Sequence, residues 1–391
     1  MSTNKFYGWE NGHLKELVTL QRGFDITKYQ QEDGQYSVIS SSGFQSKHSE
    51  FKVHGPGVII GRKGTLGTVY YSEKPYWPHD TTLWVKDFHG NNPKFSYYFL
   101  KNLHLEKYDS GAANPTLNRN HIHMLPVKIP SVPTQKSIES IISRYDDLIA
   151  NNEKRIKILE ELSQRLYVEW FVKFRFPGHE KVKIVDSGTT YNRIPEGWEV
   201  KKIKELGKVT TGKTPSTSEL ANFGGNVLFI KTPDLHGNIF ILDTEQTLSD
   251  LGAKSQAIKM LPEKTVFVSC IGTLGVVGIT SRPSQTNQQI NAVVADEANN
   301  YIMLYFFMKG LKKQLVGLGS NGATMGNVNK DKFENIKIIY PNKKLREEFF
   351  NHTANLFDEI LNLEKQIKTL SKIRDLLIPQ LVTGRRELKH I

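Results

Sequence analysis

An internal repeat is the feature of this 391-residue chain that most constrains its fold. Two copies of a similar sequence follow one another, and the offset between matched blocks rises along the chain from 189 to 208 and then to 211 positions. The matched blocks are 14–23 with 203–212, 58–69 with 266–277 (both containing Gly-Thr-Leu-Gly), and 118–130 with 329–341. Such self-similarity predicts one structural unit that occurs twice, and the rising offset places extra residues in the second copy.

The match at offset 211 continues into two stretches with heptad periodicity. Apolar residues recur every seven positions on the same phase in both stretches, which is typical of helices that pack along one another. Mutual antiparallel pairing is favoured over two helices that each cover only a neighbouring domain. The residues predicted to pair the helices are Ile138, Tyr145, Leu159 and Leu166 in the first stretch and Phe349, Leu356, Leu363, Leu370 and Leu377 in the second.

The ends of these helices carry recognisable signals. Ser131 and Asn342 are matched N-cap candidates, whereas Pro177-Gly178 and Pro379 are expected to bound the far ends. Asn152 occupies the heptad position that Leu363 holds in the second copy. It is expected either to fix the helix register, as buried polar residues can, or to face solvent.

The rest of each copy is rich in turns and contains short β-branched and aromatic runs. The runs predicted as strands are 58–60, 68–71, 83–85, 227–230, 266–268 and 292–294. The sequence therefore predicts an α+β fold, with two similar mixed α+β globules separated and joined by two long antiparallel helices and related by a pseudo-two-fold internal repeat. The predicted boundaries are 1–130 for the first globule, 131–185 for the first helix and linker, 186–341 for the second globule, and 342–391 for the second helix and tail.

The charge and the cysteine content indicate the class of partner and the cellular compartment. Lys and Arg number 52 against 40 Asp and Glu, a formal net charge of +12, and this surplus favours a polyanionic partner because cations near phosphates release condensed counterions. Cys270 is the single cysteine, which excludes an intrachain disulfide and a multi-cysteine zinc site and fits a reducing, cytoplasmic location. No apolar run reaches the length of a membrane span, so a membrane role is not expected.

One segment suggests an ATPase. Residues 207–215 (GKVTTGKTP) match the loop of P-loop ATPases, whose backbone N–H groups bind phosphate, and 292–297 resembles an acidic strand end that would hold magnesium. The aligned first-copy block, however, shares only the glycine, Gly23 for Gly212, and Pro215 removes an N–H that a phosphate loop would use. The segment also lacks the strand and helix alternation of a nucleotide-binding sheet. A turn explains the shared glycine better.

Other enzymatic signals are weak. Asp186 with Glu199-x-Lys201 resembles a metal-nuclease pattern, but such spacings are frequent by chance. His121 and His123 would lie on one face of a strand, yet no third metal ligand accompanies them. These patterns favour a protein that binds over one that catalyses a reaction.

Several motifs in a fixed order resemble one family. They are LQRGFDI, GPGVIIGRKGTLGTVYYS and WPHDTTLWV in the first copy, EWFVKFRFPGHE after the first helix, IPEGWEVKKIKEL, TGKTPST and FIKTPDL in the second copy, and LLIPQLVTG near the end. Together they resemble the specificity subunit of type I DNA restriction-modification systems, and the resemblance covers nearly the whole chain.

The resemblance implies a non-catalytic DNA-recognition subunit. Each globule would be a target recognition domain for one half of a bipartite double-stranded DNA site. The helices would act as spacers and dock adenine-N6 methyltransferase (modification) subunits, two per chain, in a complex with ATP-dependent restriction subunits. S-adenosylmethionine, ATP and Mg²⁺ would be bound by those partners, and no cofactor or metal by this chain. Trp170, Phe171, Phe174 and Phe176 would either pack under the second globule or contact a modification subunit.

Three alternatives stay open. The nearest is the recognition subunit of a two-subunit type II system that cuts on both sides of its site, which would need the same two recognition domains. An ATPase or nuclease in its own right is disfavoured by the motifs above. A scaffold without DNA affinity is disfavoured by the basic surplus.

Base recognition requires side chains with well-placed donors and acceptors: Arg or Lys for guanine, and Asn or Gln for adenine. The predicted DNA-binding residues of the first globule are Arg62, Lys63, Thr65, His79, Asp80, Thr81 and Arg119. Those of the second globule are Lys231, Thr232, Thr273, Asn287, Gln288, Gln289 and Asn327. For any single residue among them, contact with phosphate or with nothing is the more frequent outcome, because most protein–DNA hydrogen bonds go to the backbone.

Overall fold

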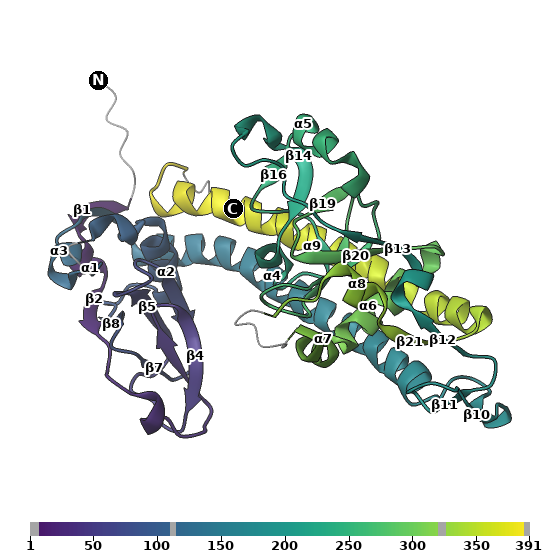
Figure 1. The fold of residues 1–391 in the computed structure, drawn as a ribbon. Helices are drawn as coiled ribbons and strands as arrows, with labels where there is room; N and C mark the ends of the chain where they lie inside the picture. Colours follow the sequence, from purple (N-terminus) through teal and green to yellow (C-terminus); the bar gives the residue numbers. More distant parts are fainter. Residues whose placement is uncertain (1–7, 110–114, 320–325, 387–391) are drawn as a thin grey trace. The chain divides into compact units, whose positions relative to one another are not determined.

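The computed structural model describes residues 8–109, 115–319 and 326–386, and the chain divides into two compact units. Unit 1 comprises Met1–Ile149 with Thr369–Ile391, and unit 2 comprises Ala150–Lys368. Each unit contains one globule and part of each of two long helices, α4 and α9, which are the longest coiled ribbons in Figure 1.

The first globule combines an antiparallel sheet and a smaller mixed sheet with short helices. A four-stranded sheet has the order β2-β8-β5-β6, a three-stranded sheet the order β4-β3-β7, and β1 pairs with β9. The strands are β1 (Trp9–His13), β2 (Thr19–Arg22), β3 (Tyr36–Ser40), β4 (Gly43–His48), β5 (Gly57–Gly61), β6 (Val69–Ser72), β7 (Tyr76–Pro78), β8 (Thr82–Asp87) and β9 (Pro126–Pro130). The helices are α1 (Leu14–Leu17), α2 (Pro93–Asn102) and α3 (Arg119–His123).

The second globule repeats this plan with additions. Its larger sheet has the order β13-β20-β17-β18-β15 and its smaller sheet β16-β14-β19, while β12 pairs with β21 and β10 with β11. The strands are β10 (Ile184–Asp186), β11 (Arg193–Pro195), β12 (Glu199–Lys202), β13 (Gly207–Thr211), β14 (Phe223–Ile230), β15 (Phe240–Ile241), β16 (Thr247–Leu248), β17 (Val266–Ser269), β18 (Val277–Thr280), β19 (Ser284–Thr286), β20 (Ile290–Ala295) and β21 (Lys337–Tyr340). The helices are α5 (Asp250–Ser255), α6 (Tyr301–Gly310), α7 (Lys312–Gly319) and α8 (Lys330–Glu334).

The two topologies correspond strand by strand. The order β2-β8-β5-β6 matches β13-β20-β17-β18, and in both smaller sheets the central strand pairs in parallel with the last one, β3 with β7 and β14 with β19. The second globule adds β15 and α5 between the strands that correspond to β3 and β5. These additions explain why the offset rises from 189 to 208, and the predicted internal repeat and α+β class are confirmed.

The six predicted strand runs coincide with strands, except that Thr68 precedes β6, because each run packs β-branched or aromatic side chains into a core. Strands β5 and β17 are buried along their whole length, which suits apolar runs without alternation. Around β5, the core of unit 1 also includes Ile138 of α4 and Ile378 of α9. Thus the long helices supply part of the core that covers the sheet.

The long helices are close to their predicted extents. Helix α4 (Val132–Tyr167) continues as a π-helical turn, Val168–Val172, and α9 spans Lys343–Val382. Asn342 caps α9, because its Oδ1 accepts a hydrogen bond from Leu345 N–H at 3.0 Å. Pro379, however, lies inside α9, so the prediction that it ends the helix is wrong. Only the last turn follows this proline, and the loss of one N–H there does not break the helix.

Within each unit the two helices run antiparallel. In unit 2, Asn152 Nδ2 donates to Gln366 Oε1 at 3.1 Å, and Arg155 Nη2 donates to Glu359 Oε1 at 2.6 Å, so numbers rise on α4 as they fall on α9. Asn152 is only 4% exposed, which favours a role in helix register over exposure to solvent. In unit 1, Arg374 donates to Asp146 at 2.8 Å.

The residues predicted to pair the helices are all buried or half-buried. Phe349 packs against Tyr167 at the end of α4, Ile138 lies in the core of unit 1, and Leu363 is fully buried. Leu159 and Leu166 pack against the core of unit 2 and Leu377 against that of unit 1, while Tyr145, Leu356 and Leu370 are half-buried. Their individual contributions to pairing stay predictions.

The aromatic cluster after α4 belongs to the core of unit 2. Trp170, Phe171 and Phe176 are at least 93% buried, and Phe171, Phe174 and Phe176 surround the ring of Trp198. Packing under the second globule is therefore the interpretation that the structure supports. Among the helices that the structure describes, none is long and apolar enough to cross a bilayer.

Candidate nucleic-acid interface

Strand ends bring several segments of the first globule together along one edge. Arg62 N–H and Lys63 N–H both donate to Thr81 O, at 2.8 and 3.0 Å, and Gly23 N–H donates to Thr82 O at 3.0 Å. These bonds hold the ends of β2 and β5 against the turn between β7 and β8. The first edge is defined here as Arg22, Asp25, Arg62, Lys63, His79, Asp80 and Thr81.

The second globule has two of these three bonds at the repeat offsets. Cys270 N–H donates to Gln289 O at 2.7 Å, and Gly212 N–H donates to Ile290 O at 3.1 Å. The turn between β19 and β20 thus corresponds to the turn between β7 and β8, with Asn287 in the place of His79. The second edge is defined here as Thr211, Thr214, Cys270, Asn287, Gln288 and Gln289.

Close backbone packing requires a glycine in each edge. A Cβ atom on Gly23 would lie 2.1 Å from His79 O, and one on Gly212 would lie 2.1 Å from Asn287 O. Atoms cannot approach so closely, so any other residue would push the two segments apart. This steric demand explains the shared glycine of the repeat without any phosphate ligand.

The P-loop resemblance fails on the same geometry. A phosphate loop needs unoccupied backbone N–H groups, but Gly212 N–H donates to Ile290 O and Lys213 N–H donates to Thr286 O at 2.9 Å. Thr214 Oγ1 donates to Gln288 Oε1 at 2.7 Å. The segment 207–215 is a strand and a turn that belong to the second edge.

In the magnesium-binding, nuclease and histidine patterns, Glu297, Glu199 and His123 each have a partner within the protein. Glu297, in the acidic pattern, pairs with Arg346 of α9, and this hydrogen bond lowers the pKa of the Glu297 carboxyl group. Glu199 pairs with Lys201 at 2.9 Å. His123 lies in α3, and its Nε2 accepts a hydrogen bond from Leu20 N–H at 2.8 Å. The predicted strand at the two histidines is wrong because the Asn118 side chain caps a short helix there.

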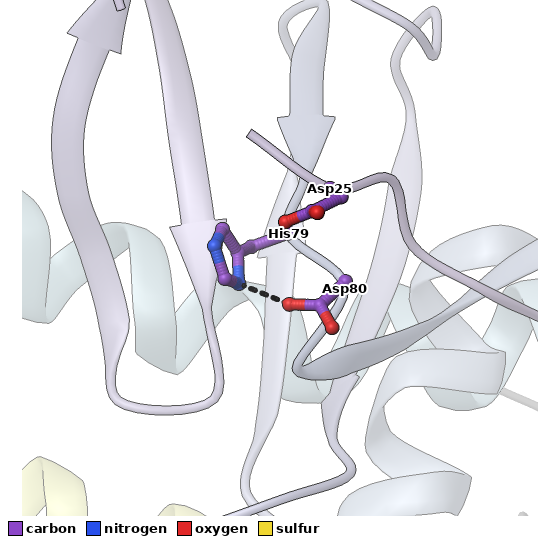
Figure 2. Close-up of side chains that lie close together, drawn as sticks. All are labelled: Asp25, His79 and Asp80. Carbon is purple, nitrogen blue, oxygen red and sulfur yellow. Dashed lines mark ion pairs between the residues drawn. The ribbon is translucent and has the colours of Figure 1, made fainter. Parts of the chain in front are cut away.

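Charged side chains converge on the first edge. Figure 2 shows His79 and Asp80 facing each other with Asp25 beside them, and His79 Nδ1 lies 3.0 Å from Asp80 Oδ1. The second carboxylate oxygen of Asp80 accepts a hydrogen bond from Arg22 Nη2 at 2.8 Å. Arg62 is half-buried and its Nη1 has no hydrogen-bond partner among the described residues. Burial and the charge of Arg22 lower the pKa of Arg62, while Asp80 raises it.

The acids and the histidine of this edge have the spacing of metal ligands. One ligand atom from each of Asp25, His79 and Asp80 lies within 4.8 Å of the others, and no other such group of three occurs among the described residues. Asp80 is already paired with Arg22, and the charge of Arg62 acts on it too. A cation would have to displace Arg22, so the cluster is better described as a balanced set of fixed charges.

Amides and hydroxyls take these places in the second edge. Asn287 Nδ2 donates to Gln289 Oε1 at 3.0 Å, and Gln289 N–H donates to Asn287 Oδ1 at 3.1 Å. Thr232 Oγ1 donates to Gln289 Oε1 at 3.3 Å. The pair Thr214 and Gln288 occupies the positions that Asp25 and Asp80 hold in the first edge. Neutral hydrogen bonds thus replace the charge pairs.

The remaining predicted residues of the first globule adjoin the first edge. Thr65 is exposed in the loop that follows Arg62 and Lys63. Arg119 begins α3, two positions after Leu117, whose N–H donates to Arg62 O at 3.0 Å. The structure therefore brings this predicted set together, and its contact with DNA stays a prediction.

The corresponding residues of the second globule differ in how tightly their side chains are held. Lys231 Nζ donates to Gln246 Oε1 at 2.7 Å, away from the amides of the edge. Thr273 and Asn327 are both exposed. Asn327 bridges Ile271, directly after Cys270 of the second edge, and Thr273 follows two positions later.

Sequence reasoning missed two members of the first edge, Arg22 and Asp25. Both flank Gly23, which the repeat aligns with Gly212 of the P-loop-like segment. The P-loop resemblance points to phosphate binding at the second copy and marks neither residue. The alignment of Gly23 with Gly212 is the signal that identifies them.

A buried carboxylate joins α9 to the second globule within unit 2. Glu364 is 5% exposed, and its oxygens accept hydrogen bonds from Ile239 N–H at 2.7 Å and Phe240 N–H at 3.0 Å. Burial raises the pKa of Glu364 to about 7, although the two backbone donors oppose the rise. Nearby, Glu160 of α4 accepts hydrogen bonds from Tyr305 and Lys309.

Comparison with known proteins identifies both repeats. The family model described as "Type I restriction modification DNA specificity domain" matches residues 7–161 and again residues 195–370. This chain belongs to the type I restriction-modification specificity family. The two matched segments are the two copies of the repeat, so the specificity domain occurs twice.

Individual relatives agree with this assignment. The HindI specificity subunit of Haemophilus influenzae is 32% identical over 326 residues, covering 69% of this chain and 71% of that protein. The MjaIX specificity subunit of Methanocaldococcus jannaschii is 25% identical over 342 residues, covering 85% of this chain and 78% of that protein. The crystal structure of a type I S subunit from M. genitalium has a TM-score of 0.62 and 16% identity over 100% of this chain and 99% of that one, which shows a shared fold.

Proposed function

We propose that each globule recognises one half of a bipartite double-stranded DNA site through its edge. The observation that carries this proposal is the repetition of one backbone edge, with matched hydrogen bonds and a matched tight glycine, in two specificity domains. Side chains suited to base edges, Arg and Lys in one globule and Asn and Gln in the other, lie on these frames. The net charge of +12 supplies the attraction to the DNA backbone.

The long helices are assigned to spacing and docking. Helix α4 has 36 residues, which at ~1.5 Å per residue gives a length of roughly 54 Å, more than the ~34 Å of one duplex turn. Leu148, Ile158 and Leu162 on α4 and Leu376 on α9 are at least half exposed. Such apolar positions are suited to a protein partner. We assign them to modification subunits, and because the specificity domain occurs twice we propose two such subunits per chain.

The catalytic steps are assigned to partner subunits. In this proposal the chain is a non-catalytic subunit that works in the cytoplasm with the DNA. S-adenosylmethionine is bound by the adenine methyltransferase subunits, and ATP and Mg²⁺ by the restriction subunits. A type I complex is favoured over a two-subunit type II system because the curated relatives quoted above carry type I names.

The proposal is tested by mapping adenine methylation in a host that expresses the chain together with its modification subunit. A bipartite motif with methylated adenine on both strands, absent when this chain is omitted, is the expected result. Identical methylation with and without the chain would overturn the proposal. Cleavage of unmodified DNA by the complete complex is expected to require ATP, whereas cleavage without ATP would favour the type II system.

A further inference from the structure

We propose that Arg22 recognises a guanine base in the half-site of the first globule and that Asp80 positions its guanidinium group. The inference rests on the proposed function, because it names the chemistry by which one of the two edges discriminates between bases. In this proposal Asp80, one of the residues predicted to contact DNA, does not touch the DNA and acts as a positioning residue for Arg22.

Arg22 is placed for base recognition by the end of strand β2. Its side chain is 54% exposed, whereas that of Asp80 is only 19% exposed. One carboxylate oxygen of Asp80 accepts from Arg22 Nη2 and the other lies 3.0 Å from His79 Nδ1. Arg22 thus holds one oxygen within the protein, His79 lies beside the other, and the negative charge would repel phosphate. The carboxylate restricts the rotamers of Arg22, which leaves less conformational entropy to be lost on binding.

Arg22 keeps guanidinium donors that no protein acceptor uses. Among the described residues, the one hydrogen bond of its side chain runs from Nη2 to Asp80. Arg62 Nη1 also lacks an acceptor among these residues, but it is buried and cannot reach a base. The remaining donors of the exposed guanidinium group, fixed in place, are complementary to a group that presents two acceptors. In the major groove of DNA, guanine presents N7 and O6 in this way, and bidentate contact from arginine is the commonest specific contact.

The second edge has no comparable surplus. The position of Arg22 is occupied by Thr211, whose Oγ1 donates to Asn291 Oδ1 at 2.5 Å. The position of Asp80 is occupied by Gln288, which accepts from Thr214. An identical backbone frame thus carries amides that both donate and accept, a pattern complementary to adenine. The guanidinium chemistry therefore belongs to one half-site only.

The test uses the full chain in complex with its modification subunit and selects bound duplexes from a randomised DNA library at one salt concentration. The variants are Arg22→Lys, Arg22→Ala and Asp80→Asn. Arg22→Ala and Asp80→Asn are each expected to lose selection for guanine at a single base pair of one half-site, with cognate affinity falling about 5- to 150-fold for Arg22→Ala. Arg22→Lys is expected to weaken this selection without abolishing it, because lysine can contact guanine but lacks the planar guanidinium group. The other half-site is expected to be unchanged, and combining Arg22→Lys with Asp80→Asn is expected to cause little further loss.

Lys86→Ala is the matched control. Lys86 is an exposed cation toward the far end of β8 from the first edge, and its removal should leave every selected base unchanged. Equal weakening on all sequences by Arg22→Ala, with a shallower salt dependence, would assign Arg22 to phosphate and overturn the inference. If Asp80→Asn lowered the unfolding temperature without shifting any base, its role would be structural. A wild-type complex without sequence preference would overturn the proposed function itself.

Discussion

The two edges share a backbone and differ in polar chemistry. In the first, Asp80 is engaged by Arg22 and His79. In the second, Gln288 at the equivalent position forms a neutral hydrogen bond with Thr214. Main-chain hydrogen bonds and a close glycine contact hold both frames. The comparison teaches that the backbone of the edge does not depend on the side chains attached to it. One fold can therefore present two different sets of donors and acceptors to DNA.

The largest effect on stability is expected at the glycine that both edges share. Gly212→Ala would place a methyl group against Asn287 O, and Gly23→Ala would place one against His79 O, each at 2.1 Å. We expect each substitution to lower the free energy of unfolding by about 2–4 kcal/mol, because the backbone segments must separate. Chemical denaturation of the purified chain measures this.

Gly310→Ala in α6 is the control, since no atom lies within 4 Å of its built Cβ. It should leave stability unchanged or slightly raised. If Gly212→Ala unfolded with the wild-type free energy while Gly23→Ala lost several kcal/mol, the two backbone frames would not be equivalent.

A second difference between the units lies in the charged contacts of α9. In unit 1, Arg374 of α9 pairs with Asp146 of α4, whereas in unit 2 Glu364 of α9 is buried, with a pKa raised from 4.5 to about 7. The folded state therefore binds more protons between these two values, so stability falls as pH rises from 4.5 to 7, by at most about 3 kcal/mol. This loss is complete above pH 7 and absent below 4.5.

Glu364→Gln removes this titration and keeps one acceptor oxygen, whereas the carboxylate offers one oxygen each to Ile239 N–H and Phe240 N–H. Relative to wild type, the variant should gain stability between about pH 5 and about pH 8, as followed by thermal unfolding. A stability difference between variant and wild type that does not change with pH would show that folding does not raise the pKa of Glu364.

The smallest effect concerns the helix position at which the copies differ. Asn152 is buried and bonds to the exposed Gln366, whereas the equivalent residue of the second copy is Leu363. Asn152→Leu should raise the free energy of unfolding by about 1 kcal/mol, because Gln366 can bond to water instead. Denaturation of Asn152→Leu beside Asn152→Ala measures this, and a loss in both would show that the amide itself stabilises the pairing.

The strands and helices that follow from local sequence periodicity could be predicted. The β-branched runs at 58–60 and 292–294 lie in strands, and the heptads at 138–166 lie in a helix, because side-chain periodicity determines which face is buried. The composition of the first edge could not be predicted in this way. Arg22 and Asp80 are 58 positions apart and meet only through the register of β2, β8 and β5. The expectation that Pro379 ends α9 is wrong because a proline is tolerated in the last turn of a helix.

The most direct test of the account exchanges one edge for the other. The substitutions His79→Asn, Asp80→Gln and Thr81→Gln give the turn of the first globule the side chains of the second, and adenine methylation is then mapped in cells that also express the modification subunit. The account predicts that one half of the bipartite motif changes while the other half and the spacer stay the same. Changes in both halves, or an unchanged motif with full methylation, would contradict the claim that each edge recognises its own half-site.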